Sequence, residues 1–319
     1  MKISKIITAF VLCISFTLCT AYAAPAADET ADCLFSIAPS PAVASIGGEW
    51  TVIGLKRSSL NIPDSYFNEY ESRAAEALIS SGGDLGRKYT EYSRMAIALA
   101  VIGKDPFNVG GYNLFDYIND FDKVVSQGIN GAISALLAKD ICNDSDYAAA
   151  EKYMNFILEN QHQNGSFGMS ENSSDTDVTA MAVTALCPHQ GDFRIDRAIN
   201  RAFLYLSEVQ LSDGSFSPSP DDNTGSCEST AQVIIAMRAF GLSENDSYFV
   251  KDGNTVYDGL NVFRCDGGGY KHITAETGTN QMATEQALLA LTQPQQPVKT
   301  LIYDRIWFEA GAEYFKESV

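Results

Sequence analysis

The feature that most constrains the fold of this chain is a short internal repeat. Residues 161–167 read QHQNGSF and residues 210–216 read QLSDGSF, so both follow the pattern Gln-x-x-Asn/Asp-Gly-Ser-Phe. Each copy precedes an alanine-rich run, TAMAVTAL at 179–186 and TAQVIIAM at 230–237. A recurrence of this kind indicates a fold built from stacked copies of one supersecondary unit.

Two weaker copies extend the pattern along the chain. CDGGGY at 265–270 lacks the Gln and precedes TEQALLAL at 284–291, and GGY at 110–112 precedes GINGAISALLA at 128–138. The leading Thr residues lie at 179, 230 and 284, so the unit recurs every 51 to 54 residues. We interpret each unit as an outer helix, a Gly-aromatic turn and an inner helix. The Asn/Asp-Gly step supplies the positive φ of the turn, the aromatic ring packs over it, and a polar residue caps the next helix.

This arrangement resembles the Gln-x-x-x-Gly-x-aromatic repeat of the squalene cyclase and protein prenyltransferase superfamily. The strings SDTDVTAMAVTAL (174–186) and GSCESTAQVIIAMRAFG (225–241) also look like helix starts in the toroid of the vitamin B12 carriers intrinsic factor and transcobalamin. The resemblance covers roughly residues 50–315. It implies an all-α fold, an α/α toroid of about five to six helix hairpins. It implies no single function, because this fold hosts cyclases, transferases and non-catalytic carriers.

The N-terminus is typical of an export signal. Lys2 and Lys5 precede a mostly apolar run at 6–19, and Ala21-Tyr22-Ala23 forms a small-x-small cleavage site. We expect residues 1–23 to be a signal peptide, 24–48 an extended leader rich in Ala, Pro and Ser, and 49–319 the toroid domain. No other segment is long and apolar enough to span a bilayer. The expected protein is secreted or extracytoplasmic, or held at the cell surface by a partner.

Helical spacing predicts alternating outer and inner helices. Outer helices are expected at 64–80, 113–122, 146–160, 193–209, 254–264 and 299–316, and inner helices at 90–103, 128–139, 177–187, 227–240 and 280–292. Almost no stretch alternates with period two, so the sequence predicts essentially no sheet.

The charge balance excludes some partners. The formal charge of −18 becomes −20 once the signal with its two lysines is removed. Nucleic acids and anionic membranes favour basic surfaces, so neither is an expected partner.

Polar residues at the starts of the inner helices are the candidate site. These helices all enter from the Gly-aromatic side, so their electropositive N-termini are expected at one rim of the ring. The expected ligand-binding residues there are Asp177, Glu228, Asn280, Gln281 and Tyr92.

One string at this rim supports an enzymatic alternative. Asp175-Thr176-Asp177-Val178-Thr179-Ala180 resembles the Asp-x-Asp-Asp-Thr-Ala motif of squalene-type cyclases. The resemblance implies a general acid at Asp177, supported by Asp175, whereas Val178 replaces the last Asp. Alkene protonation also requires an aromatic-lined cavity, and the inner helices carry Ala, Met, Val and Ile. The alternatives for Asp177 are therefore a catalytic acid, a helix cap or a rim ligand.

Metal and hydrolase chemistry have weak support in the sequence. The prenyltransferase resemblance places Cys227 and His272 near zinc-ligand positions, but Gly225 stands where that family has an Asp. The chain has three His residues and no Gly-x-Ser-x-Gly, His-Glu-x-x-His or phosphate-loop motif. We expect no metal and no required cofactor.

Five cysteines follow the signal, so at least one is free or pairs between chains. Cys142 and Cys187 fall at the ends of successive inner helices, and Cys227 and Cys265 fall in successive turns. Disulfides 142–187 and 227–265 are one interpretation, and buried thiols are the other.

The leading hypothesis is a secreted, non-catalytic protein that binds a bulky, partly apolar small molecule, corrinoid-like or isoprenoid-like, at the rim. The alternatives are a terpene or squalene cyclase-type enzyme that uses Asp177, and a structural module that binds a cell-surface protein.

Overall fold

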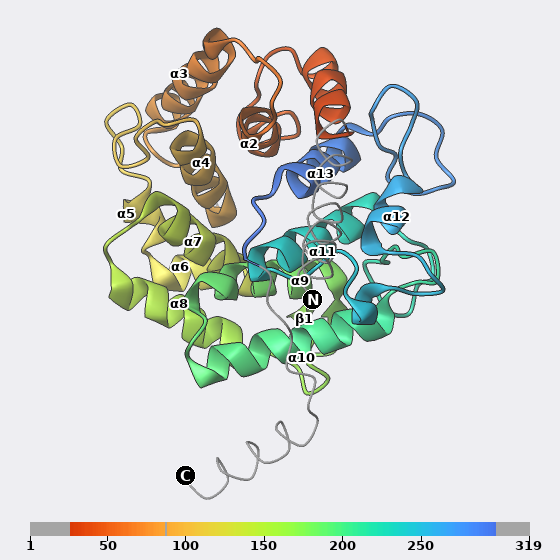
Figure 1. Ribbon diagram of the computed structural model, residues 1–319. Helices are drawn as coiled ribbons and strands as arrows, with labels where there is room; N and C mark the ends of the chain where they lie inside the picture. Colours follow the sequence, from red (N-terminus) through yellow and green to blue (C-terminus); the bar gives the residue numbers. More distant parts are fainter. Residues whose placement is uncertain (1–25, 87, 298–319) are drawn as a thin grey trace, which may run out of the picture.

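Six helices form a closed inner ring. The computed structural model describes residues 26–86 and 88–297. Within them, each inner helix contacts its two neighbours, and the last contacts the first (Figure 1). The ring runs in the order α2 (Glu49–Arg57), α4 (Tyr89–Val101), α7 (Ile129–Cys142), α9 (Thr176–Leu186), α11 (Cys227–Phe240) and α13 (Gln281–Thr292).

Further helices surround this ring. Figure 1 shows them outside the inner helices. They are α3 (Asp64–Ser81), the short α5 (Phe115–Ile118) and α6 (Phe121–Val125), α8 (Tyr147–Glu159), α10 (Phe193–Val209) and α12 (Val256–Asn261). The architecture is an α/α toroid, as the repeat predicts. The expected last outer helix at 299–316 lies outside the described residues.

The N-terminal region differs from the expectation. Residues 26–37 are helical rather than extended, and Ala31 and Leu34 are fully buried in the core. The first inner helix, α2, was not expected, because it is only nine residues long and no Gly-aromatic turn precedes it. Tertiary packing decides both cases: Val52, Ile53 and Leu55 of α2 are each at most 1% exposed.

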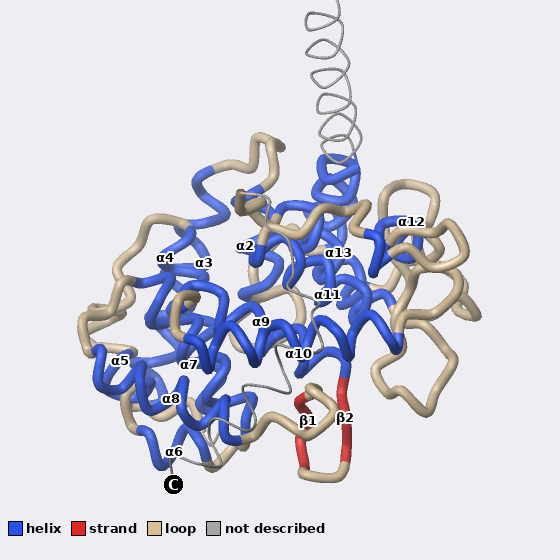
Figure 2. The backbone as a smooth tube through the Cα atoms, turned by 60° about the horizontal axis from the view of Figure 1, so that its bottom comes forward, coloured by secondary structure: helices blue, strands red, loops and turns tan. Residues whose placement is uncertain are grey.

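A two-stranded antiparallel sheet interrupts the helices. β1 (Phe167–Ser170) pairs with β2 (Ser173–Asp175) between α8 and α9 (Figure 2). The sequence predicts almost no sheet, and this hairpin has the polar composition of a turn rather than the alternating pattern of a half-buried strand. The hairpin matters because it leads directly into the start of α9.

The repeated Gln closes the turn of its own unit. In two copies its side-chain amide donates to the carbonyl of the turn Gly, from Gln161 to Gly165 (2.9 Å) and from Gln210 to Gly214 (3.0 Å). The same amide also reaches the next outer element, at Ala198 in the first copy. Both glycines have positive φ, as expected, so the repeated letters correspond to a repeated hydrogen-bonded loop.

The repeated aromatic residue and the repeated Thr bind each other. The backbone N–H of Phe216 donates to the hydroxyl of Thr230 (3.0 Å), and that ring is fully buried. The other two copies have the same bond, from Phe167 to Thr179 (2.9 Å) and from Tyr270 to Thr284 (3.0 Å). The bond ties each Gly-aromatic turn to the first turns of the inner helix that follows it, which fixes the start of that helix.

In the part of the chain that the structure describes, no helix combines the length and apolar character needed to cross a membrane.

Candidate functional site

The inner helices begin on one face of the ring. Thr51 near the start of α2 donates to Glu285 in the first turns of α13, with 2.9 Å between the oxygens. The side chain of Ser229 at the start of α11 is close enough to Asp177 at the start of α9 to lower its pKa. The exposed amide groups of these helix starts therefore share a rim, which we call the N-terminal rim.

Asp177 is an acid at this rim with a strongly shifted pKa. Burial raises its pKa to about 6, and the charges of Asp175 and Glu228 act in the same direction. The Ser229 hydroxyl and His272 act in the opposite direction. The Oδ1 atom of Asp177 is buried and has no hydrogen-bond partner among the described residues. This carboxyl group is thus protonated more readily than an ordinary aspartate, and one of its oxygens is uncommitted.

Glu228 and His272 form a pair beside it. Glu228 Oε2 lies 2.7 Å from His272 Nδ1, and the glutamate side chain is 15% exposed against 46% for the histidine. The backbone holds the histidine in place, because its C=O accepts the N–H of Cys227 (2.9 Å) and its N–H donates to Glu276 (2.9 Å). His272, which the prenyltransferase resemblance places near a zinc-ligand position, is therefore paired with a glutamate.

Cys227 is the other residue that the prenyltransferase resemblance places near a zinc-ligand position, and it is buried. Cys227 is 0% exposed, and its thiol lies 3.5 Å from the carbonyl oxygen of Ala283. Across the described residues, no group of three or more His, Cys, Asp or Glu side chains is arranged to hold a metal ion.

Two of the expected rim residues are helix caps. Asp175 accepts the N–H of Val178 (2.9 Å), and Asn280 accepts the N–H of Ala283 (3.1 Å). The cap of α9 is therefore Asp175 and not Asp177, which rules out the capping alternative for Asp177. The side-chain oxygens of Asp175 and Asn280 that make these bonds are committed to the backbone.

Tyr92 is also committed to structure. It is 1% exposed, its hydroxyl donates to the carbonyl of Gly83 (2.9 Å), and it accepts the N–H of Leu85 (2.7 Å). Its ring stacks on Tyr117 with centroids 4.3 Å apart. This residue positions the loop before α4 instead of facing a shared mouth with Asp177.

Two buried glutamates at the same rim were missed by sequence reasoning. Glu49 and Glu285 are 1% and 2% exposed, and burial raises the pKa of each. Glu285 accepts the N–H of Gly47 (2.6 Å) and lies near Gln281, at 3.4 Å between side-chain atoms. Glu49 accepts the hydroxyl of Tyr70 (3.2 Å). The sequence feature that could have indicated them is an acid in the first turns of an apolar helix, such as Glu285 in the string TEQALLAL.

Unused hydrogen-bonding atoms gather at this rim. Most buried polar groups in proteins have partners. Of the seven buried side-chain atoms without a partner among the described residues, four belong to the first two turns of α4, α7 and α9: Arg94 Nε, Asn130 Oδ1, Thr176 Oγ1 and Asp177 Oδ1.

None of the five described cysteines forms a disulfide, which favours the thiol interpretation over the disulfides 142–187 and 227–265. Cys142 directs its thiol at the carbonyl of Ala96 on α4 (3.5 Å), away from α9 and Cys187. Cys265 lies against the carbonyl of its own neighbour Phe263 (3.9 Å), whereas Cys227 points at α13. Sequence position alone does not show these thiol directions.

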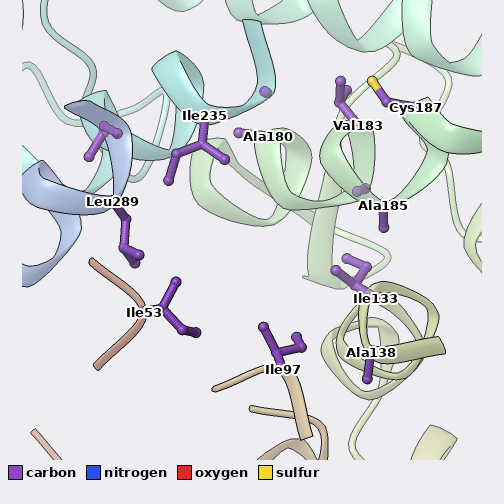
Figure 3. Packing of buried hydrophobic residues seen from close by; sticks show 14 of the residues in the cluster. Ile53, Ile97, Ile133, Ala138, Ala180, Val183, Ala185, Cys187, Ile235 and Leu289 are labelled. Carbon is purple, nitrogen blue, oxygen red and sulfur yellow. The ribbon is translucent and has the colours of Figure 1, made fainter. Parts of the chain in front are cut away.

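A cavity of about 560 Å³ lies in the middle of the ring. Figure 3 shows Ile53, Ile97, Ile235 and Leu289 projecting from four different inner helices toward this shared space. Its walls are mostly aliphatic, and Trp50 is its aromatic residue. The lining also includes Arg57, Leu137, Asp140, Ile141, Met181, Thr184, Cys187, Pro188, Gln190, Gln232, Ala239, Gln293, Pro294 and Gln296.

The position of the cavity corrects the expectation of a rim pocket. Its lining comes mainly from the middle and C-terminal halves of the inner helices and from the segment after α13. Asp177, Glu228, Asn280, Gln281 and Tyr92 do not contribute to it. The structure thus separates an apolar central cavity from the polar N-terminal rim, which the sequence analysis had treated as one site.

We expect the variant Asp177→Asn to be more stable than the parent at pH 7. The folded-state pKa of about 6 exceeds the ordinary 3.8, so ionisation costs stability as the pH rises through 6 and costs none below about 3.8. The difference corresponds to about 3 kcal/mol at pH 7 and shrinks toward zero at pH 4. Urea unfolding of both proteins between pH 4 and 8 measures it.

The exposed loop variant Asp266→Asn is the control, and its stability should follow that of the parent at every pH. A less stable Asp177→Asn variant at pH 7 would show that the ionised carboxylate is anchored by its neighbours rather than penalised by burial.

Structural comparison places the chain among α/α toroids. A polysaccharide lyase matches with a TM-score of 0.62 and 11% identity, over 86% of this chain and 96% of that one. Candida albicans protein geranylgeranyltransferase-I, complexed with GGPP, matches at 0.54 with 13% identity, over 82% and 89%. A UGL variant with the oligosaccharide dGlcA-Glc-Rha-Glc matches at 0.52 with 13% identity, over 76% and 84%. No protein-family model and no curated protein matches the sequence.

These similarities establish the fold and confirm the toroid prediction. At 11–13% identity they do not transfer a substrate or a residue role. The three neighbours act on or bind different molecules, so the function has to be argued from the residues of this chain.

Proposed function

We propose that this chain is an exported binding protein whose central cavity holds a bulky, partly apolar small molecule. The cavity carries the proposal: about 560 Å³ is within the range of roughly 300–1,000 Å³ in which small-molecule pockets fall. Its aliphatic walls favour a body without charge, and a few polar side chains among them supply orientation. The expected signal at residues 1–23 supports an extracytoplasmic location.

The wall chemistry favours an isoprenoid-like ligand over a corrinoid-like one. Branched aliphatic side chains from four helices converge on one space, and such walls match a flexible hydrocarbon in shape and polarity. A corrinoid macrocycle with its amide side chains needs polar partners around its whole edge, whereas the seven polar side chains of this lining lie among mostly apolar walls. A corrinoid therefore remains the second ligand class to test.

The N-terminal rim motivates one other candidate, an acid-catalysed cyclase that uses Asp177. The supporting observation is a carboxyl group with a pKa of about 6 and an unpartnered oxygen. Against it, Asp177 is not part of the cavity lining, and a single aromatic side chain faces that cavity. Carbocation chemistry needs the acid and the aromatic walls in one chamber. Incubation with squalene tests this candidate, because a cyclised product that Asp177→Asn abolishes would establish it.

Filling the cavity tests the binding function. We expect farnesol or squalene to raise the melting temperature of the parent protein in a thermal-shift assay, with cyanocobalamin as the corrinoid arm. The variant Ile235→Trp places a larger side chain in the space toward which Ile235 projects, so it should lose at least tenfold in affinity. Ile97→Phe, on the opposite side of the ring, is the second filling variant.

The matched control is Ile79→Trp on α3, where the side chain is 58% exposed. It should bind like the parent. Equal binding by the parent and both filling variants would place the ligand outside the cavity. If none of the three ligands changes the melting temperature, the protein-interaction alternative is favoured, and a cell-surface protein becomes the expected partner.

A further inference from the structure

Among the described residues, the cavity wall contains one positively charged side chain, and none of them gives it an acidic partner. Arg57 ends α2 and lines the cavity together with Gln293. Its guanidinium Nη1 donates to Gln293 Oε1 at 3.0 Å, and no ion pair among the described residues includes it. A guanidinium has five N–H donors, so most of its capacity is unused by the described residues.

This isolation is unusual for the composition of the chain. The sequence has 40 Asp and Glu against 22 Lys and Arg, so carboxylates are abundant. Arg57 is nevertheless half-buried, and burial alone lowers its pKa. A desolvated cation without a counter-ion costs stability. The fold therefore maintains a position whose charge an incoming anion would compensate.

The surroundings hold Arg57 in this place. Gln293, which accepts its hydrogen bond, is itself held through its backbone carbonyl by Arg238 Nε at 2.5 Å. At the C-terminus of α2, the Ser58 hydroxyl rather than the guanidinium donates to the carbonyl of Leu55 (2.8 Å). The bond to Gln293 in the cavity wall thus explains the direction of the Arg57 side chain better than an interaction with the end of α2 does.

Another part of the wall, on α7, has a negative charge. Asp140 at the end of α7 also lines the cavity, and its Oδ2 lies 2.9 Å from His189 Nε2. The C-termini of the inner helices, α2 included, add partial negative charge at this end of the ring, so the Arg57 charge has to outweigh it for an anion to bind there. An anion is consequently attracted at Arg57 and repelled near Asp140, so a charged ligand would take one orientation.

We propose that the ligand of the central cavity is an anionic amphiphile whose compact oxyanion headgroup, a carboxylate or a phosphate, pairs with Arg57 while its hydrocarbon body lies against Ile53, Ile97 and Leu289. The inference rests on the proposed binding function and specifies the ligand class. A guanidinium is suited to such headgroups because its planar fork donates two parallel hydrogen bonds.

Trp50 provides the measurement. The chain has two tryptophans, Trp50 in the cavity wall and Trp307, so a Trp307→Phe background leaves Trp50 as the reporter. In this background, decanoate, decyl phosphate, decanol and decyltrimethylammonium are titrated below their micelle concentrations. All four share one body and differ in the headgroup. We expect the two anions to bind at least tenfold more tightly than decanol, and the cation to bind most weakly.

Variants of Arg57 test whether this residue causes the preference for anions. Arg57→Gln should bind the two anions only as tightly as decanol, and its affinity for decanol should equal that of the parent. Arg57→Lys should retain part of the preference for anions. The control Lys56→Gln removes the adjacent, exposed positive charge and should change nothing. Circular dichroism verifies the fold of each variant.

The outcomes separate the two proposals. If decanol and the anions all fail to change Trp50 fluorescence, the proposed binding function is wrong. If decanol binds and the anions bind no more tightly, the binding function stands and the headgroup inference is wrong. An anion preference that survives in Arg57→Gln would also overturn the assignment to Arg57. The ratio between decanoate and decyl phosphate identifies which oxyanion the site favours.

Discussion

Replacement of Phe216 by alanine is expected to lower the free energy of unfolding by about 3–5 kcal/mol, as removal of a fully buried phenylalanine does in other cores. The ring is 0% exposed, and its backbone N–H is bonded to Thr230 at the start of α11. A cavity at this position removes the packing that holds the Gly-aromatic turn against the inner helix. Urea denaturation followed by circular dichroism measures the loss.

The control for this prediction is Tyr147→Ala, which removes a ring that is 80% exposed and should cost less than about 1 kcal/mol. The equivalent aromatic positions, Phe167 and Tyr270, are also buried and bonded to a Thr. We therefore expect alanine at either position to behave like Phe216→Ala. A cost below about 1 kcal/mol at Phe216 would mean that the repeated aromatic residue does not hold the turn.

Replacement of Asp144 by alanine is expected to cost about 3–5 kcal/mol, because it leaves a buried cation without its counter-ion. The ammonium of Lys139 on α7 is 1% exposed and pairs with Asp144, which is 9% exposed. Its other partner is the side-chain oxygen of Asn119, at 2.7 Å, and that amide cannot neutralise the charge. The same urea experiment, at pH 7, gives the magnitude.

Two variants test the reason for this cost. Glu69→Ala breaks the exposed pair with Arg73, whose side chains are 45% and 39% exposed, and should cost less than about 1 kcal/mol. The double variant Lys139→Met/Asp144→Asn removes both charges and should recover much of the loss, since no unpaired charge stays buried. A double variant as unstable as Asp144→Ala would assign the cost to packing rather than to charge.

The long inner and outer helices were predictable, because their signals are local. Phe193–Val209 and Cys227–Phe240 begin and end at the predicted residues. The first carries apolar residues at helical spacing, and the second ends at Gly241, whose φ is 96°. The helix over residues 26–37 has no comparable local signal, and its burial against the toroid determines it.

The site was predicted in part. The sequence identified Asp177 and Glu228, and the structure brings these two side chains together at the N-terminal rim. It also brings His272 there, which the sequence suggested only as a weak zinc position. The sequence did not identify Arg57, since a basic residue in the last turn of a helix is common and usually lies in solvent. Arg57 gains significance only because α2, α13 and the segment after it surround the same cavity.

The sequence by itself determined that hairpins of one kind recur and that their inner helices start on one side, because turn and cap chemistry acts over a few neighbouring residues. The tertiary structure alone decided where the closed ring leaves space, which thiols face away from each other, and which charges are left unpaired. Those outcomes depend on side chains that meet across 50 or more residues of chain, as Arg57 meets Gln293, and no local pattern encodes such distances.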